Sequence, residues 1–537
     1  MSSRDQATLL IKGGMVFDGH GNDPVRADIA ISEDRVTTVG DLSHMEALST
    51  IDATGMHVAP GFIDIHTHSD ISIKFHAAQH SAIGMGVTTQ VVGNCGLAPG
   101  FANDSDVFAF EKRWLVPHGE TINWNSFAQH LQQVEDGGVG TNYVPLAGHG
   151  TLRKRVIGME NRKPDAAEMQ QMCSILEGAM LAGAWGLSSG LEYLPGGYAD
   201  VDELTILCKV AASNGGLYAT HLRNEGDTLV ESVEEAVEVA RGANIPLQLS
   251  HHKAEGTNNW GKTIATLKLI ERCREEGLDV QTDQYPYNAF MTGLSVQVLP
   301  FRAQSASPTD LRAMLTDPLL RSELKKEILM VHPEWADGSL HGPWSLLQIG
   351  VCRSAPQYQG KTISSLGAES GKHPLDWTLD LLLETSGFVS AVNFAIGDED
   401  IERVLKFPFT SIGSDGVGTH PNGVGGQDQV HPRAYGTFAR ILGHYVRELK
   451  VLSESEAIRR MTSLPAVRFN LQDRGFLKPG AYADVVIYNP ATIADVATFA
   501  APHQFAEGIQ TVVVNGNIAM QNGEFSDSLS GKVLRHG

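Results

Sequence analysis

The stretch GFIDIHTHSD, residues 61–70, opens with an apolar run of strand length and ends with two histidines, His66 and His68, that are separated by one residue. A short apolar run that follows glycine predicts a buried strand. Side chains two residues apart on a strand point to the same side, so both imidazoles should face one space. A strand that needs only burial has no use for this pair, so we expect its end to bind a ligand.

The central part of the chain repeats this pattern of strand-length apolar runs separated by helix-length segments. Segments 166–184 and 228–243 carry apolar residues at three- and four-residue spacings, which predicts helices. Alternating strands and helices are typical of a parallel sheet, and eight such units indicate an α/β fold of the (β/α)8 TIM-like barrel type. The eight predicted strands are 61–68, 88–96, 142–150, 184–191, 216–223, 246–253, 278–285 and 410–416.

The two ends of the chain have a different texture, with short β-branched runs and polar turns. Residues 27–40 predict a hairpin with its turn at 32–34. Neither end alone has enough strands to bury a face, so we expect 1–58 and 476–537 to form one small β-sandwich domain. The barrel then spans 59–475. The interval 288–408, between strands seven and eight, is too long for one crossover and predicts an inserted region, partly helical, that covers the site.

Composition excludes several partners. The chain has 62 acidic and 41 basic residues, a net charge of −21, which disfavours nucleic acid and anionic membranes. Its start does not resemble a signal peptide, and no apolar run approaches the ~20 residues of a membrane span. Five scattered cysteines argue against a disulfide framework, so we expect a cytoplasmic protein that acts on a small molecule. The sequence leaves the oligomeric state open.

Polar residues recur where the predicted strands end. Active residues of such barrels lie at the C-terminal ends of the strands. Imidazole, thiolate and carboxylate together are ligands typical of zinc. One such residue alone is more often structural, but their coincidence at five strand ends predicts a metal site. The residues are His66 and His68, Cys95, His221, the pair His251 and His252, and Asp415.

The sixth predicted strand offers two histidines in sequence. His251 follows the apolar Leu249 by two residues, so alternation would turn both side chains into the barrel. The same alternation would direct Lys253 into the cavity. The choice between His251 and His252 nevertheless stays open at this point.

Several motifs carry a resemblance to a known family. PGFIDIHTH (60–68) resembles the first-strand signature of the metal-dependent amidohydrolase superfamily. The ordered set is similar to the D-aminoacylase, or N-acyl-D-amino-acid deacylase, family, and the resemblance spans almost the whole chain. It comprises GNCG (93–96), THLRNEG (220–226), LSHHK (249–253), QYPY (284–287), GSDG (413–416), HPRAYGTFAR (431–440) and LKPGAYADVVIYNP (477–490). Segment 298–311 departs from the family pattern, so a preference for one substrate side chain does not transfer.

The resemblance implies a role for individual residues. It implies a tight zinc site and a second, weaker or vacant metal position that shares Cys95, a catalytic carboxylate, and groups that hold the substrate's α-carboxylate. The ligands of the tight zinc would be Cys95, His221 and His251, and those of the weaker position would be His66 and His68. The catalytic carboxylate would be Asp415. The substrate-binding groups would be Lys253, Tyr285 and Arg433, with Tyr193 near the site in an unassigned role. D-stereochemistry follows from the resemblance alone.

The chemistry of such a site is amide hydrolysis. Zinc lowers the pKa of bound water towards ~7 and polarises a carbonyl oxygen, so that zinc-bound hydroxide attacks the acyl carbon. Asp415 would take the proton of the water and pass it to the leaving amine. The expected products from an N-acyl-D-amino acid are a carboxylic acid and a D-amino acid.

Three other readings compete with this one. A cyclic-amide hydrolase, such as a dihydropyrimidinase or dihydroorotase, typically carries a carboxylated lysine on its fourth strand, but segment 184–191 has no lysine. A covalent role for Cys95 is disfavoured because the histidines that would activate it are expected on the metal. A non-catalytic zinc-binding homologue is disfavoured by Asp415, since a structural zinc site needs no spare carboxylate.

Overall fold

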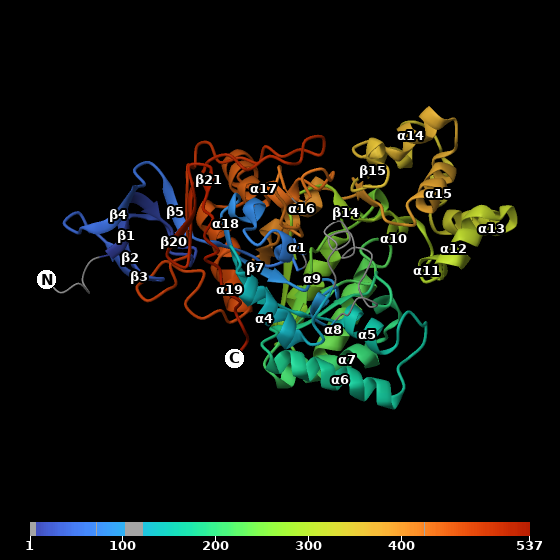
Figure 1. Ribbon diagram of the computed structural model, residues 1–537, viewed down its shortest axis with the longest axis horizontal. Helices are drawn as coiled ribbons and strands as arrows, with labels where there is room; N and C mark the ends of the chain where they lie inside the picture. The colour runs from blue at the N-terminus through green and yellow to red at the C-terminus, as the bar shows by residue number, and fades with distance from the viewer. Residues whose placement is uncertain (1–6, 71, 102–121, 424) are drawn as a thin grey trace.

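The computed structural model describes residues 7–70, 72–101, 122–423 and 425–537. Figure 1 shows the first strands, in blue, beside the last strands, in red, at one end of the molecule. Helices in yellow project at the opposite end, and strands and helices from the middle of the chain lie between. Within the described residues, no helix is both long and apolar enough to span a membrane.

The central strands pair in parallel at all eight predicted places. One sheet has the order β6-β7-β8 and another the order β9-β10-β11-β12-β13-β17. Leu146 alone separates β8 from β9, and a parallel bridge joins Thr67, after β6, to Gly416, after β17. The strands are β6 (Phe62–Asp64), β7 (Val87–Val92), β8 (Asn142–Pro145), β9 (Ala147–Gly148), β10 (Gly186–Gly190), β11 (Leu217–His221), β12 (Leu247–Leu249), β13 (Val280–Gln284) and β17 (Thr410–Ile412).

Amphipathic helices cover these strands. Both helices predicted between strands are confirmed, as α6 (Ala166–Leu181) and α8 (Leu229–Ala243). Asp165 begins α6 with a capping box, in which its carboxylate accepts from the backbone of Glu168. The other helices around the strands are α1 (Ser72–Phe75), α2 (His80–Ile83), α4 (Phe127–Gly137), α5 (His149–Val156), α7 (Val201–Ser213), α9 (Thr263–Glu275), α16 (Asp398–Lys406), α17 (Arg433–Arg440), α18 (Glu454–Met461) and α19 (Ser463–Arg468).

Both chain ends contribute to one mixed sheet. In the described part of the chain this sheet has nine strands, ordered β21-β20-β19-β18-β5-β1-β2-β3 with β4 beside β1. The predicted hairpin is present as β2 (Val25–Ser32) and β3 (Arg35–Gly40). The other strands are β1 (Ala7–Val16), β4 (Ala47–Asp52), β5 (His57–Pro60), β18 (Val485–Tyr488), β19 (Ile509–Val514), β20 (Asn517–Gln521) and β21 (Glu524–Phe525). The hydrogen bonds thus make one continuous sheet, and the domain boundaries stay a prediction.

The interval between β13 and β17 contains a region that we call the insertion, residues 290–393. It combines a small antiparallel sheet, ordered β14-β16-β15, with helices and has a hydrophobic core of its own around Trp335, Trp344 and Trp377. Residues 308–331, within the interval predicted to be partly helical, form two helices, because Asp317 caps the second and Pro318 begins it. The elements are β14 (Phe290–Gly293), β15 (Leu347–Ile349), β16 (Ser390–Asn393), α10 (Leu294–Val298), α11 (Phe301–Gln304), α12 (Pro308–Thr316), α13 (Pro318–Val331), α14 (Ile363–Ser370) and α15 (Pro374–Glu384).

Candidate active site

The structure brings the predicted metal ligands together at the C-terminal ends of the parallel strands. Cys95 Sγ lies 3.4 Å from His66 Nε2, 3.5 Å from His251 Nε2 and 3.9 Å from His221 Nδ1. The nitrogens His221 Nδ1 and His251 Nε2 are 2.9 Å apart. All four side chains are buried. Residues that are up to 185 positions apart in the chain therefore meet around one sulfur atom.

The ligand atoms form two groups that share Cys95. One group is Cys95, His221 and His251, and the other is His66, His68 and Cys95; within each group the atoms lie within 4.8 Å of one another. A thiolate with two imidazoles is a donor set that zinc prefers, and each group supplies three of the four ligands that zinc usually takes. The residues present therefore fit one or two zinc ions.

The backbone turns sharply where the strands end. Cys95, His251 and Asp415 all have positive φ, at 54°, 34° and 50°, a region that residues other than glycine rarely adopt. β12 ends at Leu249, so strand alternation does not extend to His251 and Lys253, and that part of the sequence argument was wrong. The backbone N–H of His251 instead donates to Asp283 Oδ1 at 2.7 Å, which holds the turn.

The structure places His251, and not His252, beside Cys95. His252 Nε2 lies 2.7 Å from Thr266 Oγ1, away from the cluster. Burial lowers the pKa of His252 to about 4, so this ring is neutral. His252 is thus a buried, hydrogen-bonded histidine of the core.

Asp415 lies between the second ligand group and a cation. Its Oδ1 is 3.0 Å from His68 Nε2, and its Oδ2 is 2.8 Å from a guanidinium nitrogen of Arg433. Burial opposes ionisation of Asp415, but the Arg433 charge and the hydrogen bond from His68 hold the pKa of Asp415 well below its usual value. The carboxylate is therefore ionised and able to accept a proton.

The thiol of Cys95 is also held in its charged form. Burial raises the pKa of a thiol, yet His66 and His251 next to the sulfur lower the pKa of Cys95 well below the usual value. A thiolate is the form in which cysteine binds a metal ion. The charge state of Cys95 therefore agrees with the ligand role predicted for it.

The three residues predicted to hold a carboxylate are neighbours in the structure. The Arg433 guanidinium lies 4.7 Å, and the Lys253 ammonium 5.8 Å, from the centre of the Tyr285 ring. The Lys253 ammonium is 2.5 Å from Glu225 Oε2. Among the described residues, the buried Tyr285 hydroxyl has no hydrogen-bond partner, so it remains available to a ligand. Tyr193 packs over the His221 ring at 4.7 Å.

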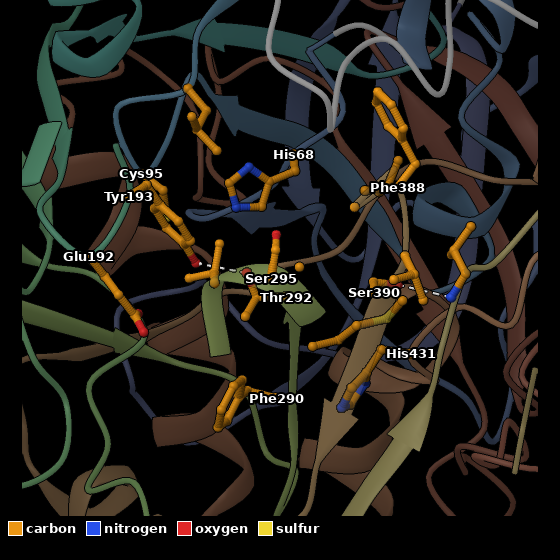
Figure 2. Close-up of a pocket in the computed structure, with 18 of the residues that line it drawn as sticks. His68, Cys95, Glu192, Tyr193, Phe290, Thr292, Ser295, Phe388, Ser390 and His431 are labelled. Carbon is orange, nitrogen blue, oxygen red and sulfur yellow. Dashed lines mark hydrogen bonds between the residues drawn. The ribbon is translucent and has the colours of Figure 1, made fainter. Parts of the chain in front are cut away.

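A cavity of about 800 Å³ opens onto this cluster. In Figure 2, Cys95, Tyr193 and Glu192 stand on one side of it, and Phe388 and Ser390 of the insertion on the other. The insertion thus supplies one wall of the cavity, where the sequence predicted a cover. Arg302, the arginine of segment 298–311, is not among the described residues that line the cavity; it is exposed and pairs with Glu327.

Sequence reasoning missed three carboxylates behind the histidines. Asp283 Oδ1 lies 3.2 Å from His66 Nδ1, Glu225 Oε1 lies 3.0 Å from His251 Nδ1, and Glu192 Oε2 lies 2.7 Å from His221 Nε2. In each ring the other nitrogen faces Cys95. Carboxylates in this place fix the tautomer and orientation of metal-binding histidines. Residue spacing in the sequence did not indicate these carboxylates, because each contacts a histidine that comes from a different strand or turn.

Comparison with known proteins agrees with this geometry. The chain matches the profile of the amidohydrolase family over residues 49–296 and 420–520. It is 34% identical to the D-aminoacylase of Alcaligenes xylosoxydans xylosoxydans, over 98% of this chain and 97% of the relative. It is also 34% identical to the N-acyl-D-glutamate deacylase of the same organism, over 96% of this chain and 93% of the relative.

A solved structure resembles the whole chain. It is the N-acyl-D-glutamate deacylase of Bordetella bronchiseptica, in complex with zinc and a phosphonate inhibitor that mimics the tetrahedral intermediate of its reaction. Its TM-score against this chain is 0.82 at 31% identity, with 99% of this chain and 100% of that chain covered. The architecture described above is therefore shared from end to end with an enzyme that binds zinc.

Proposed function

Since the chain belongs to the amidohydrolase family, we propose that it hydrolyses the amide bond of N-acyl-D-amino acids to a carboxylic acid and a D-amino acid. One observation carries the proposal: Cys95, His221 and His251 form a buried ligand group that opens, beside the ionised Asp415, onto a substrate-sized cavity. The names of the relatives supply the substrate class and its D configuration.

We infer that the resident metal is zinc. Cys95, His221 and His251 would hold the tight ion, and His66 and His68 would share Cys95 with a second, weaker one. When bound, zinc lowers the pKa of a water molecule and polarises a carbonyl group. The buried thiolate suits a permanent ligand better than a nucleophile, because the rings beside it are themselves ligands.

Asp415 is the group that moves the proton. Amide hydrolysis requires that water lose a proton and that the very basic leaving amine gain one. The Asp415 carboxylate, ionised beside Arg433 and exposed to the cavity, would accept the first proton and donate it to the amine nitrogen. One residue thereby serves as base and then as acid.

Lys253, Tyr285 and Arg433 would hold the α-carboxylate of the substrate. Two cations lie near one aromatic ring, whose hydroxyl has no partner among the residues that the structure describes, so several donors are offered to one anion. Burial raises the pKa of Tyr285, so its hydroxyl stays protonated and can donate. Tyr193 lines the same cavity and touches His221, which supports a contact with the reacting end of the substrate.

We further propose that the eight parallel strands close into a (β/α)8 barrel. The bridge between Thr67 and Gly416 supports closure between the first and last strands. The domain division proposed is 1–58 with 476–537 for the terminal β-domain and 59–475 for the barrel. A cytoplasmic location also stays a proposal, supported by five free cysteines.

The cyclic-amide alternative has less support. Fourth strand β10 carries the sequence GLSSG, which has no lysine to be carboxylated between two metals. Cys95 takes the place between the two ligand groups instead. A non-catalytic zinc protein would not need Asp415 ionised in the cavity wall.

A substrate screen tests the proposal. N-acetyl-D- and N-acetyl-L-amino acids and dihydropyrimidines are assayed on one preparation whose zinc content is measured. We expect the D series to be hydrolysed, with activity lost on chelation and restored by zinc. Turnover of the L series alone, faster turnover of the cyclic amides, or no turnover by zinc-loaded protein would each refute the assignment.

A further inference from the structure

We propose that Asp283 is a positioning residue that aligns one histidine from each metal position and so couples the two positions. The inference rests on the proposed function for the identity of the metal ligands. It adds a residue that does not touch the substrate, because Asp283 is not among the described residues that line the cavity.

The contacts of Asp283 connect β13 with β12 and with the end of β6. Asp283 lies on β13, is 1% exposed, and its Oδ1 accepts from the His251 backbone N–H at 2.7 Å, after β12. The same oxygen is 3.2 Å from His66 Nδ1, after β6. Oδ2 accepts from Gln248 Nε2 at 2.9 Å. One buried carboxylate thus contacts one member of each ligand group.

On the His66 side, Asp283 sets the direction of the ring. With Nδ1 turned towards the carboxylate, Nε2 is left facing Cys95 Sγ at 3.4 Å. The contact between His66 Nδ1 and Asp283 Oδ1 is an ion-pair approach that lacks the geometry of a hydrogen bond. The carboxylate charge still favours a proton on Nδ1, which leaves Nε2 as the nitrogen of His66 that can bind metal.

On the His251 side, Asp283 acts on the backbone. His251 has φ of 34°, a conformation that costs on the order of 1–3 kcal/mol and persists only where the surroundings enforce it. The hydrogen bond from the His251 backbone N–H to Asp283 anchors that turn. The turn directs His251 Nε2 towards Cys95 Sγ at 3.5 Å. Loss of the anchor would move a ligand of the tight position.

Glu225 offers a matched comparison. It is also a buried carboxylate, 3.0 Å from His251 Nδ1 and 3.9 Å from His221 Nε2. Both of these histidines belong to the tight group. Asp283 holds the His251 backbone and also contacts His66, whereas Glu225 contacts, among the proposed metal ligands, only ring nitrogens of the tight group.

The test compares the variants Asp283→Ala and Glu225→Ala by metal binding rather than by turnover, because an asparagine at 283 would keep an oxygen that accepts from the His251 N–H. Zinc is titrated into the metal-free full-length proteins against a chelator of known affinity. We expect Asp283→Ala to weaken zinc binding at both positions by about 10–100-fold, and Glu225→Ala to weaken it at the tight position alone. In the cobalt-substituted proteins at saturation, the visible bands should shift in Asp283→Ala, because ligand directions change; a merely structural role would leave them as in the wild type.

Each outcome decides the proposal. Unchanged zinc affinity in Asp283→Ala, or a loss of affinity at one position only, overturns the coupling while the proposed function stands. If the wild type binds one equivalent of zinc, the tight position alone is compared, and unchanged affinity there overturns the role of Asp283. A wild type that binds no zinc refutes the proposed function as well. If Asp283→Ala does not fold, Gln248→Met, which removes the hydrogen bond to Oδ2, should give a several-fold loss of affinity at both positions, and no loss overturns the proposal.

Discussion

Cys95, His251 and Asp415 stand at strand ends with a left-handed backbone, and each points its side chain at the same small volume. Such a conformation costs on the order of 1–3 kcal/mol per residue when it is not glycine. The parallel strands that precede these residues bring their ends to one edge, and the turns aim the side chains. Strain at three site residues is thus tied to the convergence that the chemistry needs.

Replacing Asp415 by asparagine separates metal binding from proton transfer. Asp415→Asn keeps the size of the side chain but cannot accept a proton. We expect zinc content near that of the wild type and a fall in kcat of about 10²–10⁴-fold on the best substrate of the screen. Zinc analysis and steady-state kinetics on one preparation measure both. Near-normal turnover would remove Asp415 from the proton path.

The sequence predicted the inner residues of the site better than those behind them. The HxH pair, Cys95 and Asp415 follow recognisable strands and His221 ends one, so the rule that active residues lie at strand ends predicts that they meet. Asp283 lies within a strand and contacts residues after two other strands. Its partners depend on how strands register around the sheet, which local patterns do not contain.

At the scale of elements, the insertion shows where local patterns fail. Its partly helical character was predicted, and Pro318 begins α13 directly after α12. Its sheet was not predicted, because β15 has three residues and pairs with β16 more than forty positions later. Short strands with distant partners leave little periodicity to detect.

Trp344 tests whether the insertion folds around its own core. The side chain is fully buried, and its indole N–H donates to the Trp335 carbonyl at 2.9 Å. Trp344→Ala should cost about 3–5 kcal/mol. Because this core is separate from those of the central strands, we expect proteolysis within 290–393, a higher KM and unchanged zinc content.

The control for Trp344→Ala is Leu319→Ala on α13, a side chain that is 76% exposed. It should change stability by less than about 0.5 kcal/mol. Limited proteolysis with mass spectrometry reads out both variants. Cleavage spread evenly over the chain in Trp344→Ala would show instead that the insertion and barrel unfold together.

Helix α4 carries a buried histidine that should make the fold sensitive to acid. His130 Nε2 lies 3.2 Å from the Tyr143 hydroxyl, and burial lowers the pKa of His130 to about 3. Below pH 6.5 the unfolded chain gains a proton that the folded chain does not, so stability falls as pH falls. From pH 7.5 to 5 the loss from this residue is ~2 kcal/mol.

Urea unfolding of the wild type and His130→Gln at both pH values measures this effect. The free energy of unfolding of the variant should fall with acidification by ~2 kcal/mol less than that of the wild type, whatever its stability at pH 7.5. Equal falls in the two proteins would mean that His130 takes up a proton in the folded state.

At the scale of the whole molecule, the chain ends complete one sheet. β5 pairs with β18 across more than 420 positions, as expected of two ends that each have too few strands. Asp484 fixes this sheet to the central strands, because it accepts from Asn142 at 3.2 Å and pairs with the buried Arg474. The last residues were assigned with 476–537 to the terminal β-domain, and their contact with the central strands was not predicted. Val533 bridges Tyr143 on β8, although the tail segment around Val533 is polar and has no strand periodicity.

The most direct test of the account is anomalous scattering at the zinc absorption edge from crystals of the zinc-loaded protein. The account predicts a peak in contact with Cys95 Sγ, His221 Nδ1 and His251 Nε2, with any weaker second peak between Cys95, His66 and His68. A loaded crystal without a peak at these atoms, or with its strongest peak elsewhere, would contradict the metal centre and the hydrolysis proposed from it.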